Sequence, residues 1–443
     1  MLFSLLSIFI AIAWIILGTS YTKLHPFIVL LIAAVVLSIL LGIDPLEATG
    51  LIFKGFFKII KNIGLLILFG TIIGAALEQS NATLALAKGI LKSLQKLPLP
   101  YAVSCIGYLV SIPVFCDAAF VILSQLNKTL SSQTKTPMVG LTVALSTGLF
   151  APHVLVPPTP GPLAAAANLN LENLILLIGV GGSIAFILIF VGGWYGNYLI
   201  KKNKYTESNE SLENSPSEKI FGLPSFSKAI LPILVPIGLM CLGTLLKIVP
   251  SFIGLEYLIV LTKPTTALGI GMLFAFRLLF KQPQKNISKA IKKGLKQAIP
   301  ILAITGMGGA LGSVIQTIPL QDYALEISTF SGFGILIPFM IAALLKTAQG
   351  SSTVAIITTS SIIFPLLSVL GLDSEMGKVW AIMALGVGSM TVSHANDSYF
   401  WIVSQMSGMD VKTAYRTHTV GTLLQGIVGL VVVFIGFTIW TAM

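Results

Sequence analysis

Long hydrophobic stretches separated by short polar segments run along almost the whole chain. Many of these stretches reach the roughly 20 residues that an α-helix needs to cross a bilayer. The pattern therefore predicts an all-α, multi-pass membrane protein. The predicted spans cover about residues 2–20, 24–43, 63–79, 100–115, 137–155, 173–199, 229–248, 258–280, 299–317, 333–346, 378–393 and 418–442.

Two of the predicted spans end in segments that cannot continue a helix, one in each half of the chain. The first segment, 153–162, reads HVLVPPTPGP, and its four prolines remove backbone donors and clash with the preceding turn. The second, 393–398, reads SHANDS and places an imidazole, an amide, a carboxylate and two hydroxyls side by side. Irregular backbone at membrane depth persists only where it lines a cavity or is buried in protein. Paired broken helices of this kind indicate the binding site of a transporter.

A second polar interruption precedes each broken helix. It reads IPVFCDAAF at 112–120 and KTAQGSSTVA at 346–355. Both lie between apolar arms that are too short to span a bilayer separately, so we expect them at the tips of re-entrant hairpins. The Gln-Gly-Ser-Ser-Thr tip offers free backbone N–H groups and three hydroxyls, which suit a carboxylate ligand. Two tips and two broken helices are expected to converge on one polar site near the midplane.

The two halves of the chain resemble each other. Ile67–Leu77 and Ile301–Leu311 match at six of eleven positions with a constant offset of 234 residues. We therefore expect two repeats, which are inverted if each contains an odd number of crossings. The predicted organisation is an N-terminal membrane repeat at 1–200, a cytoplasmic linker at 201–228 and a C-terminal membrane repeat at 229–443. The hairpins are expected at about 103–130 and 333–368, and the broken helices at about 137–168 and 378–410.

Composition narrows the function further. Only 10% of the residues are charged and 55% are hydrophobic, which leaves no room for a soluble catalytic domain. The net charge is +11, but the lysines cluster beside apolar runs, so they fit the positive-inside bias and not a nucleic-acid surface. We place the clusters at 201–204 and 281–296 on the cytoplasmic side. The chain has no Gly-x-x-x-x-Gly-Lys-Ser/Thr phosphate loop, so an ion gradient is the expected source of energy.

Asp117 and Asp397 are the candidates for proton coupling. An ionisable group within a membrane segment costs roughly 2.5–3.5 kcal/mol on insertion scales and is usually functional. A carboxylate in a low-dielectric site can also be protonated near neutral pH, as coupling requires. The alternative for Asp397 is a helix cap. The alternatives for Asp117 are a structural ion pair or a tip exposed to water.

Further candidates for substrate contact are polar residues of the two breaks. Asn396 can donate to and accept from substrate hydroxyls. Histidine as a residue type titrates near neutral pH, so His153 and His394 could relay a proton or bond a hydroxylated substrate. Packing or bracing of the breaks is the alternative for all three. Two histidines without a third ligand do not predict a zinc site.

The second tip and the first break complete the predicted substrate site. The candidates are Gln349, Ser351, Ser352, Thr353, Thr159 and Gly161. Their hydroxyls and backbone N–H groups suit a carboxylate or an ion. The alternative is that small polar residues let helices approach closely, while the surrounding prolines set the rigid break.

The segments 112–167, 343–366 and 384–430 resemble the gluconate permease (GntP) family of proton-coupled sugar-acid transporters. The motifs that carry the resemblance are HVLVPPTPGPLAAA, LLKTAQGSSTVA and SHANDSYFW. The resemblance implies a homodimer in which a domain with two re-entrant hairpins moves against a scaffold, by an elevator mechanism. Members of the family often have Glu in a Phe-Glu-Val-Gly-Phe context, where this chain has Asp117. The shorter acid leaves the identity of the substrate open.

The resulting hypothesis is a secondary transporter in the cytoplasmic membrane of a bacterium. It would import gluconate or a similar small hydroxylated monocarboxylate with protons, without a cofactor and without enzymatic activity. Coupling to sodium in the same fold is one alternative, since serine-rich tips also suit sodium. A passive channel and an intramembrane hydrolase are the others, although no Gly-x-Ser-x-Gly or His-Glu-x-x-His motif supports a hydrolase.

Overall fold

The regular structure is helical throughout the part of the chain that is described. The computed structural model describes residues 2–20, 22, 24–202, 223–248, 256–280, 287–318, 334–395 and 397–442. These residues contain no β-strand, which confirms the all-α prediction for them. Most of the predicted linker, 203–222, lies outside the described residues.

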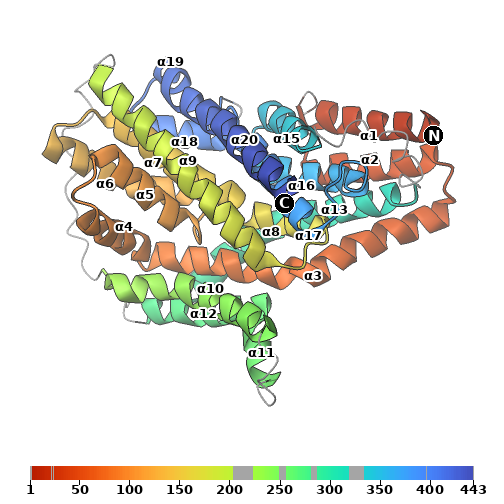
Figure 1. Ribbon diagram of the computed structural model, residues 1–443, viewed down its shortest axis with the longest axis horizontal. Helices are drawn as coiled ribbons and strands as arrows, with labels where there is room; N and C mark the ends of the chain where they lie inside the picture. Colours follow the sequence, from red (N-terminus) through yellow and green to blue (C-terminus); the bar gives the residue numbers. More distant parts are fainter. Residues whose placement is uncertain are drawn as a thin grey trace.

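Figure 1 shows the helices in their order along the chain. In the first half they are α1 (Leu2–Ser20), α2 (Pro26–Leu40), α3 (Pro45–Gln79), α4 (Ala82–Ser93), α5 (Leu99–Ser111), α6 (Cys116–Thr134), α7 (Met138–Leu155), α8 (Pro160–Asn168) and α9 (Leu174–Lys202). In the second half they are α10 (Phe226–Ile248), α11 (Glu256–Thr262), α12 (Pro264–Leu279), α13 (Ile287–Ile315), α15 (Leu336–Gln349), α16 (Ser352–Ile363), α17 (Glu375–Met390), α18 (Ser398–Met406), α19 (Val411–Ala414) and α20 (Val420–Thr441). A 3₁₀ turn, η3 (Phe364–Leu366), follows α16, and a π-helical turn, η4 (Tyr415–Thr419), precedes α20.

Three predicted spans have different bounds in the structure. The spans at 63–79 and 299–317 are only the last parts of α3 and α13, because both helices begin earlier and run through lysine-containing segments. Lysine is a good helix former, so a polar face there does not end the helix. The prediction of a single helix at 258–280 was wrong. Pro264 lacks a backbone donor and starts α12 at its first position, which separates α12 from α11.

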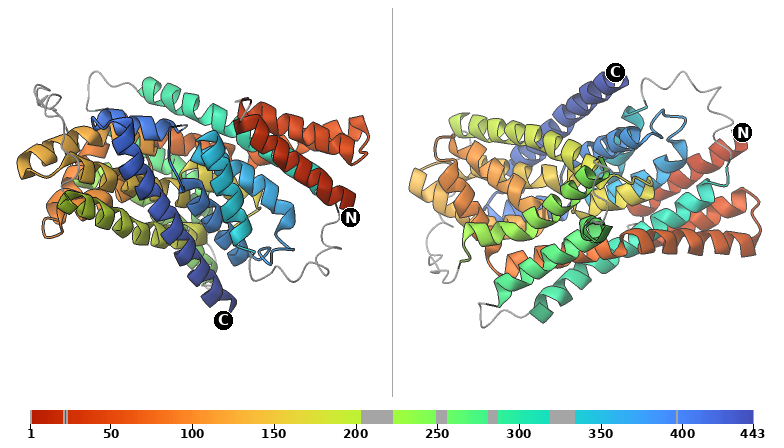
Figure 2. Two further views of the ribbon diagram at one scale, coloured as in Figure 1. Left: turned by 90° about the horizontal axis from the view of Figure 1, so that it is seen from above. Right: turned by 60° about the horizontal axis from the view of Figure 1, so that its bottom comes forward.

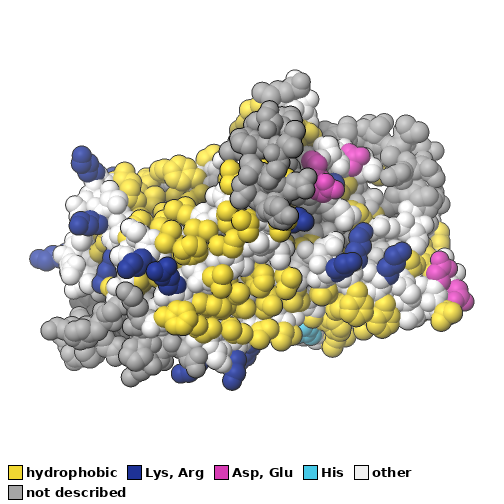
Figure 3. Space-filling model, turned by 90° about the horizontal axis from the view of Figure 1, so that it is seen from below, with side chains coloured by type: hydrophobic (Ala, Val, Ile, Leu, Met, Phe, Trp, Pro, Cys, Tyr) yellow, Lys and Arg dark blue, Asp and Glu magenta, His cyan; other side chains and the backbone are white. Residues whose placement is uncertain are grey.

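Several helical stretches are long and apolar enough to cross a membrane. Within the described residues they are Pro45–Gln79, Met138–Asn168, Leu174–Lys202, Phe226–Gly243, Ile287–Ile315 and Val411–Thr441. Apolar side chains cover much of the outer face shown in Figure 3, with groups of lysine and arginine beside them. Such a surface fits a protein embedded in lipid.

One order of elements occurs in both halves. A long helix (α3 or α13) precedes two consecutive helices (α5–α6 or α15–α16), with the short helix α4 inserted between α3 and α5 in the first half. A helix broken into two parts (α7–α8 or α17–α18) comes next, and a long helix (α9 or α20) completes the series. Two repeats would produce such a recurrence. That the halves are repeats, and that these are inverted across the membrane, stays a prediction.

The central layer consists of the broken helices and the second hairpin. The apolar window in α7 and α8 is completely buried, and most side chains of α16 and α17 are buried as well. α7 packs on α5, α9 and α17, whereas α16 packs on α8, α13 and α15. α3 and α13 lie along each other on one side of this layer (Figure 2). The functional candidates are thus held inside a shell of longer helices.

Candidate functional site

A cavity of about 260 Å³ lies where both hairpins, the end of α7 and the second break meet. Its lining combines residues that are far apart in the sequence. The first hairpin contributes Phe115, Cys116 and Asp117; the second contributes Gly350, Ser351, Ser352, Thr353, Val354 and Ile357; α7 contributes Phe150 and His153; the second break and α18 contribute Asp397, Ser398 and Tyr399; and α13 contributes Pro300, Ile301 and Ile304. The volume suits a small solute and not a peptide or a lipid.

The tip of the first hairpin begins α6 at the wall of this cavity. α6 has no side-chain cap, so the N–H groups of its first turn are not bonded by a capping side chain. Asp117 lies in that first turn, and its Oδ1 atom is 3.7 Å from the Cys116 thiol. Within the described residues no ion pair includes Asp117. Its carboxyl group is therefore available to a ligand in the cavity.

The tip of the second hairpin is only two residues long. Gly350 ends α15 with φ +79°, a left-handed conformation that glycine adopts without the steric cost of a Cβ atom. Ser351 then caps α16, because its hydroxyl accepts a hydrogen bond from Val354 N at 3.3 Å. Ser352 and Thr353, in the first turn of α16, line the cavity. The N-termini of α6 and α16 thus both adjoin the cavity, and a helix N-terminus favours anions.

The first break follows from its prolines. α7 ends at Leu155, and α8 begins with Pro160 at its first position, where a missing N–H costs nothing. His153 in the last turn of α7 is buried and lines the cavity. No described residue forms a hydrogen bond with its Nδ1 atom. Thr159 is also buried, but its hydroxyl donates to Val156 O, and neither Thr159 nor Gly161 lines the cavity.

The second break is held by the last long helix. Val392 has φ +59°, which is strained for a β-branched residue and must be imposed by its surroundings. Two bonds to the next residue supply this restraint. Ser393 N donates to the Thr422 hydroxyl at 3.0 Å, and the Thr419 hydroxyl donates to Ser393 O at 2.6 Å. The break is therefore a fixed structure and not a loose loop.

A buried ion pair joins the second hairpin to this break. Lys346 Nζ lies 2.5 Å from Asp397 Oδ2, and the two side chains are 1% and 5% exposed. The ammonium group also donates to Gly350 O at 3.0 Å and lies 5.5 Å from the centre of the Phe150 ring. Removing one member of such a pair leaves the other charge buried and unpaired.

Asp397 has two further partners. Its Oδ1 atom accepts from Tyr399 N at 3.0 Å, so it caps α18, and its Oδ2 atom accepts from the Ser393 hydroxyl at 2.6 Å. The cap considered as an alternative role is therefore present. The carboxyl group also lines the cavity. Its role in proton coupling stays a prediction.

The remaining candidates lie elsewhere or outside the described residues. His394 Nε2–H donates to Thr347 O at 2.9 Å, so it connects the second break to α15 without lining the cavity. Both amide atoms of Gln349 are buried without a partner in the described part of the chain, behind the second tip. Asn396 is not among the described residues. The described residues also contain no group of three or more His, Cys, Asp or Glu that is placed to hold a metal ion.

Sequence reasoning did not single out Lys346, Tyr399 or His418. A lone lysine in an apolar arm is a signal that could have been used, because an ionisable residue in a membrane segment normally has a partner of opposite charge. His418 is the first residue of the last predicted span, where a polar segment passes into an apolar one. Nothing in the sequence shows that Tyr399 OH donates to Ser146 O, 253 positions away.

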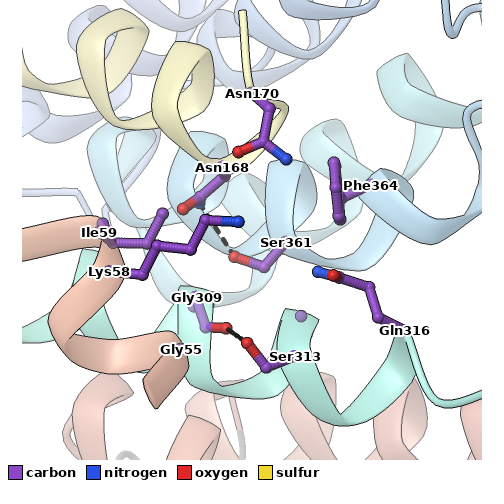
Figure 4. A pocket seen from close by; sticks show the side chains of 12 residues that line it. Gly55, Lys58, Ile59, Asn168, Asn170, Gly309, Ser313, Gln316, Ser361 and Phe364 are labelled. Carbon is purple, nitrogen blue, oxygen red and sulfur yellow. Dashed lines mark hydrogen bonds between the residues drawn. The ribbon is translucent and has the colours of Figure 1, made fainter. Parts of the chain in front are cut away.

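A second, much smaller cavity of about 20 Å³ lies between α3, α13, α16 and the end of α8 (Figure 4). It contains none of the predicted site residues. Asn168 Nδ2 donates there to Ile357 O at 3.2 Å and to the hydroxyls of Ser360 and Ser361 at 2.9 and 3.0 Å. These bonds connect the broken helix of the first half to the hairpin of the second. The volume is that of about one water molecule.

The ion pair leads to a prediction about stability. Lys346→Met leaves Asp397 buried without its cation, and we expect it to lower the unfolding free energy by about 3–5 kcal/mol. The double variant Lys346→Met/Asp397→Asn removes both charges and should regain most of that loss. Thermal unfolding of the purified protein in detergent measures both. Equal losses in the single and double variants would contradict the interpretation.

Comparison with known proteins places the chain among permeases. The family model described as GntP family permease matches residues 3–439. An uncharacterized permease of Haemophilus influenzae is 34% identical over 93% of this chain and 88% of its own length. A gluconate permease of Pseudomonas aeruginosa is 27% identical over 93% of both chains. The D-serine transporter DsdX of Escherichia coli is 27% identical over 97% of both chains.

Two solved transporters share the fold. Neisseria gonorrhoeae MtrF superposes with a TM-score of 0.66 at 15% identity, covering 95% of this chain and 96% of its own. Alcanivorax borkumensis YdaH superposes with a TM-score of 0.61, also at 15% identity, covering 87% of each chain. At this identity the likeness concerns the fold alone. The family match spans nearly the whole sequence, and the chain accordingly belongs to the GntP family of permeases and is an integral membrane protein.

Proposed function

We propose that this permease is a secondary active transporter that imports gluconate or a similar small hydroxylated monocarboxylate by proton symport. The observation that carries the proposal is the cavity between the two tips, the end of α7 and the second break. It combines two helix N-termini, the carboxyl group of Asp117, which no ion pair in the described residues includes, and a buried ion pair in a volume of about 260 Å³. A gluconate permease among the relatives supports the choice of substrate.

The substrate carboxylate is best accommodated at the second tip. The first turn of α16 presents its N–H groups together with the hydroxyls of Ser352 and Thr353. Hydrogen bonds from such donors to a charged acceptor are about twice as strong as neutral ones. Asp397 and His153 line the cavity as well, so their polar atoms suit the substrate hydroxyls.

The charge that the substrate adds to the site explains why a proton would be transported with it. The ion pair of Lys346 and Asp397 has no net charge, whereas a bound monocarboxylate adds one negative charge to a buried site. An uncompensated charge is expensive there. One proton taken up by Asp397 or Asp117 offsets this added charge, which implies one proton for each monocarboxylate.

The proposal also includes the transport mechanism, which is alternating access by an elevator motion. The protein would work as a homodimer of chains with inverted repeats, in the cytoplasmic membrane of a bacterium. The bonds of Asn168 support a moving unit in which the two halves are joined. The packed pair α3 and α13 would belong to the scaffold.

A zwitterionic amino acid is the second candidate substrate. Asp117 has no cationic partner in the described residues and lines the cavity, so it could pair with a substrate ammonium group. A D-serine transporter is also among the relatives. Coupling to sodium, through the hydroxyls of the second tip, is the alternative to the proton.

The direct test is uptake of radiolabelled gluconate into proteoliposomes with an inward proton gradient. We expect accumulation that a protonophore abolishes and that other aldonates inhibit. Inhibition by D-serine in preference to aldonates would reject the gluconate assignment. Uptake that requires sodium and ignores the proton gradient would reject proton symport.

Replacement of the candidate coupling group separates coupling from binding. Asp397→Asn keeps the cap on α18 through its amide oxygen but cannot bind and release a proton. We expect it to lose accumulation driven by the proton gradient while exchange of external for internal gluconate continues, because the neutral amide resembles the protonated Asp397 that is proposed to accompany bound substrate. Undiminished accumulation by this variant would exclude Asp397 as the coupling group.

Removal of a tip hydroxyl tests carboxylate binding. Ser352→Ala loses a donor to a charged ligand, a loss of about 1.5–3 kcal/mol that should raise the apparent KM for gluconate at least tenfold. Ser124→Ala is the control, because that buried hydroxyl bonds only to Val121 O of its own helix. An unchanged KM after separate removal of the hydroxyls of Ser351, Ser352 and Thr353 would refute the proposed location.

A further inference from the structure

A chain of hydrogen bonds leads from Asp397 away from the cavity. The Ser393 hydroxyl lies 2.6 Å from Asp397 Oδ2, and His418 Nε2 lies 3.2 Å from the Ser393 hydroxyl. His418 Nδ1 lies 3.1 Å from the Ser146 hydroxyl. Ser146, Ser393 and His418 are fully buried, and none of them lines the cavity. A protonatable imidazole is thus connected to the coupling candidate through one hydroxyl group.

Local structure holds this chain in place. His418 lies in the π-helical turn η4, and π-turns occur frequently at functional sites. The same turn and the start of α20 clamp the backbone of Ser393 through Thr419 and Thr422. The edge of the Tyr399 ring also packs against the imidazole, with ring centres 5.5 Å apart. The hydroxyl between Asp397 and His418 therefore has little freedom to move away.

Hydrogen positions along the chain can change while every heavy atom stays in place. The Ser146 hydroxyl has two acceptors within reach, Val143 O at 3.1 Å and His418 Nδ1 at 3.1 Å. It can donate to a neutral imidazole or, by turning to Val143 O, accept a hydrogen bond from Nδ1–H. The Ser393 hydroxyl can likewise donate to Asp397 or to His418 Nε2. Both the neutral and the protonated imidazole therefore have a complete set of hydrogen bonds.

We propose that His418 shares the coupling proton with Asp397 through the hydroxyl of Ser393. In the first state the proton is on Asp397 Oδ2, which donates to Ser393 Oγ, while Ser393 O–H donates to His418 Nε2. Asp397 then gives its proton to Ser393 Oγ as Ser393 gives its own to Nε2. The second state has a carboxylate at Asp397, an unchanged hydroxyl at Ser393 and an imidazolium at His418. One proton has moved, and no bond between heavy atoms has formed or broken.

The charges around Asp397 and His418 make the protonation of one residue depend on that of the other. Asp397 is the one acidic group connected to the imidazole in the described residues, and Lys346 pairs with that same carboxylate. Arg416 on the same turn is exposed, and Tyr399 is the neighbouring phenol. A cation at His418 is therefore stabilised when Asp397 is ionised. In the second state the Lys346–Asp397 pair is intact, and the imidazolium balances the substrate carboxylate.

This inference rests on the proposed proton symport. The experiment below tests the proton symport and the role of His418 separately. Proteoliposomes containing wild type, His418→Gln, Ser393→Ala, Ser393→Thr or Ser389→Ala are assayed for gluconate accumulation under a proton gradient. They are also assayed for gluconate exchange at equal pH. Ser389→Ala is the matched control, since that buried hydroxyl bonds to Gly386 O of its own helix.

We expect His418→Gln and Ser393→Ala to lose gradient-driven accumulation by at least roughly tenfold while exchange stays within about twofold, because only proton transfer is removed. Ser393→Thr, which restores a hydroxyl, and Ser389→Ala should resemble wild type. Accumulation at the wild-type level in both His418→Gln and Ser393→Ala would overturn the inference. Parallel loss of exchange and accumulation in both would overturn it too, since that indicates a structural role. Wild-type exchange without any gradient-driven accumulation would instead refute the proposed proton coupling itself.

Discussion

The buried contact between Lys346 and Asp397 is the interaction on which the rest of this site depends. It connects the arm of the second hairpin to the second break, two elements that are 51 positions apart. Lys346 also bonds the carbonyl of Gly350, and Asp397 also caps α18. A single pair of charges thus fixes the tip, the break and the start of a helix around one cavity. Neither buried charge is stable without the other. A change in the charge of one group at this site therefore requires a compensating change in the charge of another.

The two halves supply the same elements but different chemistry. Both halves contain a helix N-terminus beside the cavity and a broken helix. At the described part of the site, the buried cation Lys346 and the strained residue Val392 both come from the second half. The break of the first half is set by prolines, and that of the second by bonds from Thr419 and Thr422. In the proposed function, the first break is a rigid wall and the second is the part that responds to protons. Repeated architecture therefore need not mean repeated function.

Much of the architecture could be predicted from the sequence, because lipid imposes strict rules on it. Apolar stretches identified the membrane helices, and clusters of proline or polar residues identified the places where helices are interrupted. The structure brings Asp117, His153, Asp397 and the 351–353 tip to one cavity. Helix bounds were less accurate, since the lysines that begin α13 were left outside the predicted span at 299–317.

What the sequence could not give are the pairings across large separations. Lys346 was passed over because its partner is distant in the chain, and Thr159, Gly161 and His394 were grouped with the cavity because they adjoin residues that do line it. A side chain near a break can point to either side, and only tertiary packing decides which. His418 illustrates the same limit, since its link to Asp397 runs through Ser393, which is 25 positions from His418 in the chain.

The central claim is that one proton is bound with each substrate carboxylate, because that carboxylate adds a negative charge to a buried site. The most direct measurement compares gluconate uptake into proteoliposomes under a proton gradient alone with uptake under an inside-negative potential alone, set by potassium and valinomycin. Symport of one proton with one monocarboxylate moves no net charge. The account therefore predicts accumulation with the proton gradient and none with the potential. Accumulation driven by the potential alone would contradict it.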